Sequence, residues 1–214
     1  IGSDPRGSDV EASTLTQAIS IRSTGSVLQG IGVRRYATSV PQMGTVIVAA
    51  ADVRVSDVTI QDNSTTGLYT WSKDTTLADV SVIGNGLLGA GASQADGLEI
   101  RRMLSTGNNR ERFNRAPVSG ALKIHSSTDV VVADSVFAAA RGAGLVPNCV
   151  TGTTVAPSAD LVGAVERVEP RGSVDVGSDI TLYLYADQAA VGAPTNAPTF
   201  SGTFLEGGSA TINW

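Results

Sequence analysis

Two basic side chains near the middle of the chain have the spacing of a proton-transfer pair. Lys123 and His125 are two residues apart, so an extended strand projects both from one face, opposite Leu122 and Ile124. A lyase that cleaves an acidic sugar needs a base to remove the proton alpha to the carboxylate, and a cation to hold that carboxylate. His125, with Lys123 or Arg110 as the cation, is therefore the candidate catalytic group. The alternative is that Lys123 and His125 are ordinary exposed polar residues on a strand.

A second candidate site is segment 109–119, which gathers positive charge around one aromatic ring in an otherwise acidic chain. Its chemically active residues are Arg110, Glu111, Arg112, Phe113 and Arg115. Guanidinium groups bind carboxylates through paired hydrogen bonds, and an aromatic ring provides a flat stacking surface. We expect this segment to contact an acidic sugar. The alternative is a solvated loop whose arginines pair with Glu111 and neighbouring acids.

Two aspartates at equivalent repeat positions are a weaker catalytic candidate. Asp57 and Asp79 are expected to stack about 4.8 Å apart at the backbone. Glycoside hydrolysis uses carboxylates about 5 Å or about 6.5–9.5 Å apart. A repeated outward aspartate more often improves solubility, protects a sheet edge or binds calcium. Asp96 and Glu99 are weaker candidates still.

Composition excludes several other kinds of chemistry. The 214 residues carry a net charge of −5, which disfavours a nucleic-acid partner. One cysteine, Cys149, excludes an internal disulfide, and a single histidine excludes a multi-histidine metal centre, so we expect no metal and no cofactor. No apolar run approaches the ~20 residues that a membrane span requires.

The elements that carry these residues form a repeat. Segment 52–63 has a counterpart in 75–85 at an offset of 22 residues, and a third copy, 98–108, follows at 23. Segments 26–33 and 130–137 are less regular copies. Apolar and polar residues alternate within each copy, which is the period of a β-strand. Short strands that recur at this interval are typical of the coils of a parallel β-helix, in which each coil covers its neighbour.

One polar position recurs in register with the coils. Asn63, Asn85 and Asn108 each follow a strand, so we predict a structural ladder of stacked amides inside one corner. Leucine-rich repeats have a similar length but require leucines that are absent here, and the remaining alternative is an ordinary β-sandwich. The predicted fold is therefore all-β: a right-handed parallel β-helix, a single-stranded solenoid, with a small C-terminal β appendage.

Residues 1–145 resemble the right-handed parallel β-helix repeat proteins of bacteria, in the superfamily that also contains the pectate lyases. The resemblance is carried by Gly30–Thr38, Thr66–Trp71 and Gly107–Gly120, and is greatest to actinobacterial envelope-associated members. It implies the fold and a secreted or cell-envelope location, without specifying an activity. The chain begins at Ile1 without a signal peptide, so we expect either processing or an excerpt of a longer protein.

The C-terminal part differs in composition. Within segment 146–187, residues 165–184 are similar to the second half of a PASTA repeat, a module of bacterial transpeptidases and kinases, and this similarity implies contact with cell-wall peptide or glycan. Segment 188–214 is expected to be a linker, at 193–198, followed by a partial β-module. We accordingly place domain boundaries after residues 145 and 187.

Three functions remain open from the sequence. The favoured hypothesis is a secreted or cell-envelope module that binds polysaccharide along its solvent-facing ladder. The first alternative is a lyase or hydrolase of acidic glycans. The second is a structural, adhesin-like stalk.

Overall fold

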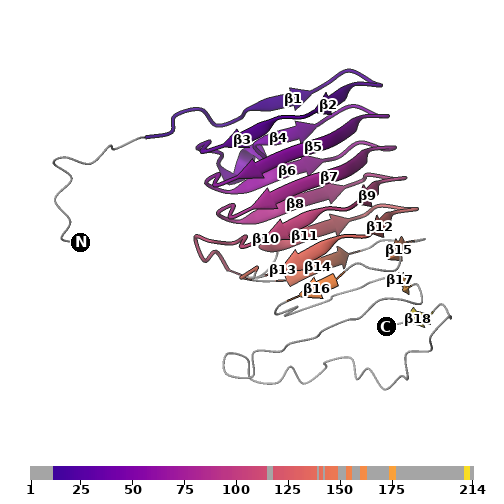
Figure 1. The fold of residues 1–214 in the computed structure, drawn as a ribbon. Helices are drawn as coiled ribbons and strands as arrows, with labels where there is room; N and C mark the ends of the chain where they lie inside the picture. Colours follow the sequence, from indigo (N-terminus) through magenta and orange to yellow (C-terminus); the bar gives the residue numbers. More distant parts are fainter. Residues whose placement is uncertain are drawn as a thin grey trace, which may run out of the picture.

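The computed structural model describes residues 12–114, 118–138, 140, 141, 143–148, 153–155, 160–162, 174–176 and 210–212. Within these residues the chain is nearly all β, with one short 3-10 turn, η1 (Val40–Gln42), and no α-helix. The strands stack in successive coils into a parallel β-solenoid, as Figure 1 shows from β1 at one end to β16 near the other. The predicted all-β solenoid is confirmed.

One side of the solenoid is a six-stranded parallel sheet, here called sheet A. Its strands, in spatial order, are β1 (Ile19–Ile21), β4 (Val46–Val48), β6 (Thr66–Thr70), β8 (Leu88–Ser93), β11 (Gly120–His125) and β14 (Ala143–Asn148). Each coil contributes one strand, so the sheet A strands of successive coils lie side by side.

The other side is a twelve-stranded sheet, here called sheet B. Its strands, in chain order, are β2 (Val27–Gln29), β3 (Gly32–Arg34), β5 (Arg54–Gln61), β7 (Thr76–Ile83), β9 (Glu99–Arg101), β10 (Leu104–Thr106), β12 (Val131–Ala133), β13 (Val136–Ala138), β15 (Thr153–Val155), β16 (Asp160–Val162), β17 (Val174–Val176) and β18 (Ala210–Ile212). The sequence repeat and the strand register coincide, because β5 and β7 pair in parallel at the 22-residue offset.

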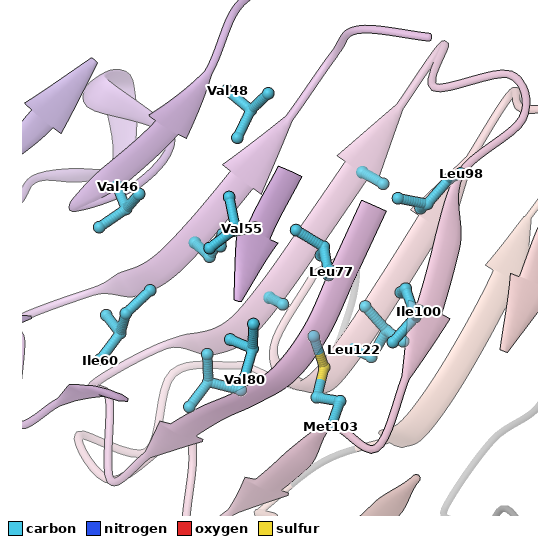
Figure 2. Close-up of a cluster of buried hydrophobic side chains, with 14 of the residues drawn as sticks. Val46, Val48, Val55, Ile60, Leu77, Val80, Leu98, Ile100, Met103 and Leu122 are labelled. Atoms are coloured by element: carbon cyan, nitrogen blue, oxygen red, sulfur yellow. The ribbon is translucent and has the colours of Figure 1, made fainter. Parts of the chain in front are cut away.

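The core lies between the two sheets. Within it, the inward-facing side chains at equivalent positions of successive coils stack in columns. Leu28, Val55, Leu77, Ile100 and Val132 follow one another in register through sheet B. The last four are at most 1% exposed. In Figure 2 the labelled members of this column, Val55, Leu77 and Ile100, point into the space between the strands. Each coil therefore buries the apolar face of the next, as the alternation of the sequence requires.

The bend in the middle of sheet B repeats a left-handed backbone conformation at one position of every coil. Gly30, Asp57, Asp79, Arg102 and Asp134 occupy this column, with φ between 50° and 70°. Aspartate and asparagine tolerate this region better than most residues. The recurring Asp57 and Asp79 are therefore explained first by the bend that they form.

Strands beyond residue 145 continue the same pairing. β14 lies parallel to β11, and β16 lies parallel to β13. β18 pairs with β17 in the antiparallel direction. Most of the PASTA-like segment and of the linker lies outside the described residues, and the domain boundaries at 145 and 187 stay predictions.

Candidate functional site

The three predicted ladder asparagines stack in one buried corner. The side-chain amide nitrogen of Asn63 donates to Oδ1 of Asn85 at 2.9 Å, and that of Asn85 donates to Oδ1 of Asn108 at 3.2 Å. Asn85 Oδ1 also accepts from the backbone N–H of Asn63, and Asn63 Oδ1 accepts from that of Tyr36. All three side chains are 2% exposed or less. Their polar atoms are used inside the corner, which makes the ladder a structural element.

Glycines make this close packing of the corner possible. A Cβ on Gly67 would lie 2.9 Å from the amide nitrogen of Asn85, and one on Gly89 would lie 2.6 Å from that of Asn108. A Cβ on Gly86 would lie 1.9 Å from the carbonyl oxygen of Ser64. Such distances exclude any side chain, so the glycines that accompany each asparagine keep the corner narrow.

The predicted loop begins directly on this corner as a compact turn. Asn109 closes the turn, since its Oδ1 accepts from the N–H of Phe113 at 2.8 Å and its Nδ2 donates to the Phe113 carbonyl at 3.0 Å. The N–H of Arg110 donates to the carbonyl of Asn85, and the N–H of Glu111 donates to that of Gly86. The turn is therefore anchored to the coil beneath it, and it holds the Phe113 ring 39% exposed.

The charges of the loop are only partly available to a ligand. Arg110 Nη1 lies 2.9 Å from Asp62 Oδ1, an exposed ion pair. Glu111 and Arg112 are exposed. Arg115 lies outside the described residues. For Arg110, this ion pair with Asp62 agrees with the alternative interpretation, in which the arginines of a solvated loop pair with neighbouring acids.

Lys123 and His125 project outward from sheet A. Their neighbours Leu122 and Ile124 are each 1% exposed and face the core, whereas Lys123 and His125 are half-buried. In the preceding coil, Gly91 lies opposite Lys123 and Ser93 lies opposite His125. The Ser126 hydroxyl contacts His125 Nδ1 at 2.7 Å, which orients the imidazole ring.

An aromatic pair occupies the same outward face on β6, one coil before the coil of Gly91. Tyr69 lies opposite Gly91 in register, and Trp71 follows two residues later with 41% of its surface exposed. The two ring centroids are 5.9 Å apart, with the planes tilted by 49°. A Cβ on Gly91 would lie 2.5 Å from a ring carbon of Tyr69, so the tyrosine ring covers the place where Gly91 has no side chain.

These residues form a continuous strip across three coils, which we call the sheet A platform. It consists of Tyr69, Trp71, Gly91, Ser93, Lys123 and His125. Neighbouring strands are about 4.8 Å apart, so Lys123 lies about 10 Å from Tyr69 along the solenoid axis. The strip therefore presents aromatic rings at one end and basic side chains at the other.

Partial burial changes the proton affinity of two groups on the platform. Burial raises the pKa of Tyr69, and a hydrogen bond with Ser93 opposes that rise. Burial lowers the pKa of Lys123, because the charged ammonium loses part of its hydration. Both shifts favour the neutral side chain, as expected on a surface that is partly shielded from water.

The structure does not bring the three predicted catalytic residues together. Lys123 and His125 share one strand face, but Arg110 lies at the asparagine corner, where the coil enters the next sheet A strand. His125 is five residues beyond Gly120, the first residue of β11, or about 16 Å along an extended strand. The loop and the basic pair are thus located towards opposite ends of the strand.

The two predicted carboxylates, Asp57 and Asp79, have different partners on the surface. Asp79 accepts two hydrogen bonds from the guanidinium of Arg102, at 2.6 and 2.7 Å. This contact lowers the pKa of Asp79 below its ordinary value. Asp57 accepts a hydrogen bond from the side-chain amide of Gln29. A strongly ionised, paired Asp79 is unsuited to donate a proton as a general acid.

Further features of the described residues are limited in scope. A shallow hollow of about 280 Å³ on the outer face of sheet B is lined by Gly32, Val33, Arg34, Thr59 and Gln61. No three His, Cys, Asp or Glu side chains in this part of the chain lie close enough to hold a metal ion. Nor does any helix there have the length and apolar character needed to cross a membrane.

Sequence reasoning missed the aromatic half of the platform. Tyr69 and Trp71 alternate with the inward-facing Leu68 and Thr70. The same alternation identified Lys123 and His125 as neighbours on one face, and applied to β6 it would have found the rings. The contact between Tyr69 and Gly91 spans two coils, so it follows only from the register of the strands.

Comparison with known proteins adds nothing to this geometry, since no family model matches the chain and no curated protein or solved structure resembles it significantly. The fold defines the class: a parallel β-solenoid with an outward aromatic and basic strip on one sheet.

Proposed function

We propose that the protein binds polysaccharide along the sheet A platform, in a secreted or cell-envelope setting. The observation that carries the proposal is the outward-facing pair of half-buried Tyr69 and exposed Trp71, in register with Lys123 and His125 across three coils. Sugar rings present C–H groups that pack on aromatic faces, and their hydroxyl and carboxylate groups accept hydrogen bonds from basic side chains. A strip with a regular strand spacing suits a polymer of repeating units better than it suits a compact ligand.

The chemistry of the platform favours a sugar chain that carries carboxylates. Lys123 and His125 supply hydrogen-bond donors, and the rings of Tyr69 and Trp71 supply stacking area. The corner loop with Phe113, Arg112, Glu111 and Arg115 is a secondary contact in this proposal.

A second candidate function is an acidic-glycan lyase, favoured by one specific arrangement. Lys123 is half-buried with a lowered pKa, and it lies on the same strand face as His125, whose ring is oriented by Ser126. A base with reduced proton affinity beside a second basic group can remove a proton alpha to a bound carboxylate. Arg110 has no part in this version, because it is paired with Asp62 at the corner.

The test is to titrate immobilised acidic and neutral polysaccharides with the wild type and with four variants, one of which is His125→Ala. Trp71→Ala should weaken binding about tenfold or more, the loss expected for one stacked ring of about 1.4 kcal/mol. Leu104→Ala is the matched control, since Leu104 is 37% exposed on sheet B, and it should bind as the wild type does. Phe113→Ala discriminates between the platform and the corner loop.

Three outcomes decide the matter. Loss of binding in Phe113→Ala but not in Trp71→Ala moves the site to the corner loop. Failure of the wild type to bind any polysaccharide contradicts the proposal and favours the stalk. Release of unsaturated sugar ends by the wild type, abolished in His125→Ala, establishes the lyase instead of the binding module.

A further inference from the structure

The middle asparagine of the ladder is followed by a glycine. Asn85 and Gly86 lie between β7 and β8 (Figure 1), and they form the one Asn–Gly pair of the sequence. The other two ladder asparagines are followed by serine and by asparagine, which carry side chains. Because glycine has no side chain, its backbone nitrogen reaches the side-chain carbonyl of the preceding asparagine without hindrance. Asn85 is therefore the ladder residue with the greatest tendency to deamidate in an unfolded chain.

The fold requires this glycine. A Cβ on Gly86 would lie 1.9 Å from the carbonyl oxygen of Ser64 and 2.7 Å from its carbonyl carbon. Both are backbone atoms of the neighbouring coil, so no side-chain movement can make room for a Cβ there. Any residue whose bulk would slow the reaction of Asn85 is thus excluded sterically. The labile pair follows from the close packing of the coils at the corner.

The folded corner engages both reacting groups in hydrogen bonds. The N–H of Gly86, whose nitrogen would attack, donates to the carbonyl of Asn63 at 2.8 Å. Asn85 Oδ1 accepts from the backbone N–H of Asn63 at 3.3 Å. Asn85 Nδ2 donates to the carbonyl of Ile60 and to Oδ1 of Asn108, each at 3.2 Å. The Asn85 side chain is also fully buried, which keeps it from the water that completes deamidation. The reaction therefore requires the corner to open.

We propose that Asn85 is a latent deamidation site, protected in the closed corner and converted when the corner opens. The deprotonated Gly86 nitrogen attacks Asn85 Cγ and forms a C–N bond, and the side-chain amide takes up a proton and leaves as ammonia. Water then adds to the resulting cyclic imide. Hydrolysis of the Cγ–N bond gives aspartate, and hydrolysis of the original peptide bond gives isoaspartate. Either product carries a carboxylate in place of the amide.

Neither product can rebuild the corner. In aspartate, an oxygen replaces the amide nitrogen and faces two acceptors, the carbonyl of Ile60 and Oδ1 of Asn108. A charge is then buried against oxygens that have lost their donor. Isoaspartate also adds a carbon to the backbone between the N–H of Asn85, which donates to Asn108 Oδ1, and the N–H of Gly86. Deamidation therefore makes the opening of the corner irreversible.

The first experiment follows deamidation of the wild-type chain in buffer and in urea at the same mildly alkaline pH, by mass spectrometry of its peptides. Asn114 is the internal control, because it is exposed and is followed by arginine. In urea, Asn85 should react about tenfold or more faster than Asn114, since only Asn85 precedes a glycine. In buffer, Asn85 should react about a hundredfold or more slower than in urea, because a buried corner opens rarely.

The second experiment asks whether modified chains refold. The wild type is partly deamidated in urea, diluted into buffer and separated into folded and unfolded fractions. Modified Asn85 should be confined to the unfolded fraction, whereas modified Asn114 should occur in both. Asn85→Asp and Asn114→Asp are the matched variants: the first should melt at a lower temperature or fail to fold, and the second should melt as the wild type does.

Each step of the proposal has an outcome that would overturn it. Equal rates at Asn85 in buffer and in urea would show that the corner gives no protection. A rate in urea no greater than that of Asn114 would show that Asn85 is not a labile site. Modified Asn85 in the folded fraction at the same share as modified Asn114, or an unchanged melting temperature of Asn85→Asp, would contradict an irreversible opening.

Discussion

The asparagine corner and the sheet A platform each extend over successive coils, but their polar groups face different ways. In the corner, Asn85 is fully buried, and its side chain bonds to Asn63, Asn108 and the carbonyl of Ile60. On the platform, Trp71 is 41% exposed, and its neighbours contact solvent. The difference teaches that periodicity alone identifies stacking, whereas the accessibility of the polar groups identifies a binding surface.

The two regions also differ in how glycine is used. At the corner, Gly86 leaves room for backbone, since a Cβ there would meet a carbonyl oxygen at 1.9 Å. On the platform, Gly91 leaves room for an aromatic ring. The first glycine allows the backbone of neighbouring coils to approach closely, and the second leaves space for the Tyr69 ring.

The largest effect is expected at the centre of the corner. Asn85→Leu removes the acceptor of the backbone N–H and of the side-chain amide of Asn63, and it removes the donor to the carbonyl of Ile60. Buried unsatisfied groups cost ~1–3 kcal/mol each. We expect a loss of about 3 kcal/mol in unfolding free energy by chemical denaturation. Asn63→Leu should cost less, since Asn63 Oδ1 accepts from the N–H of the half-buried Tyr36. Equal losses would show that the corner does not act as a stacked ladder.

Much of the arrangement of the asparagine corner, and part of that of the sheet A platform, could be predicted from the sequence. The repeat at 22 residues predicted both the ladder of Asn63 and Asn85 and the pairing of β5 with β7, because regular alternation fixes strand register locally. Alternation also predicted that Lys123 and His125 share a face. The ion pair of Arg110 with Asp62 could not be predicted, since the two residues are 48 positions apart in the sequence.

A smaller effect on stability, but a specific effect on the platform, is expected for Gly91→Ala. The added methyl group must displace the Tyr69 ring, and such overpacking typically costs ~1–3 kcal/mol. We expect a loss near the lower end of that range, together with altered Trp71 fluorescence and weaker polysaccharide binding. Gly32→Ala is the control, because nothing lies within 4 Å of a Cβ at Gly32. Unchanged fluorescence and binding in Gly91→Ala would show that this glycine does not position the ring.

The smallest effect concerns the ionisation of Tyr69. Its pKa is raised in the folded protein by burial, so the folded state holds the proton more tightly than the unfolded state does. Stability contributed by Tyr69 is therefore complete below its ordinary pKa and declines as the pH rises through the folded pKa. Alkaline titration of phenolate absorbance, with Tyr69→Phe subtracted, should show ionisation above the ordinary value. Ser93→Ala should raise the pKa further, and a lower pKa in that variant would contradict the assigned hydrogen bond.

The central claim is that the sheet A platform, and not the asparagine corner, contacts the ligand. The most direct measurement is amide hydrogen exchange of the wild type with and without the best-binding polysaccharide from the titration. We predict the largest added protection at β6, β8 and β11, around residues 66–71, 88–93 and 120–125, with a smaller increase at residues 109–114. Protection confined to residues 109–114, or none anywhere in the three strands at saturating polysaccharide, would contradict the claim.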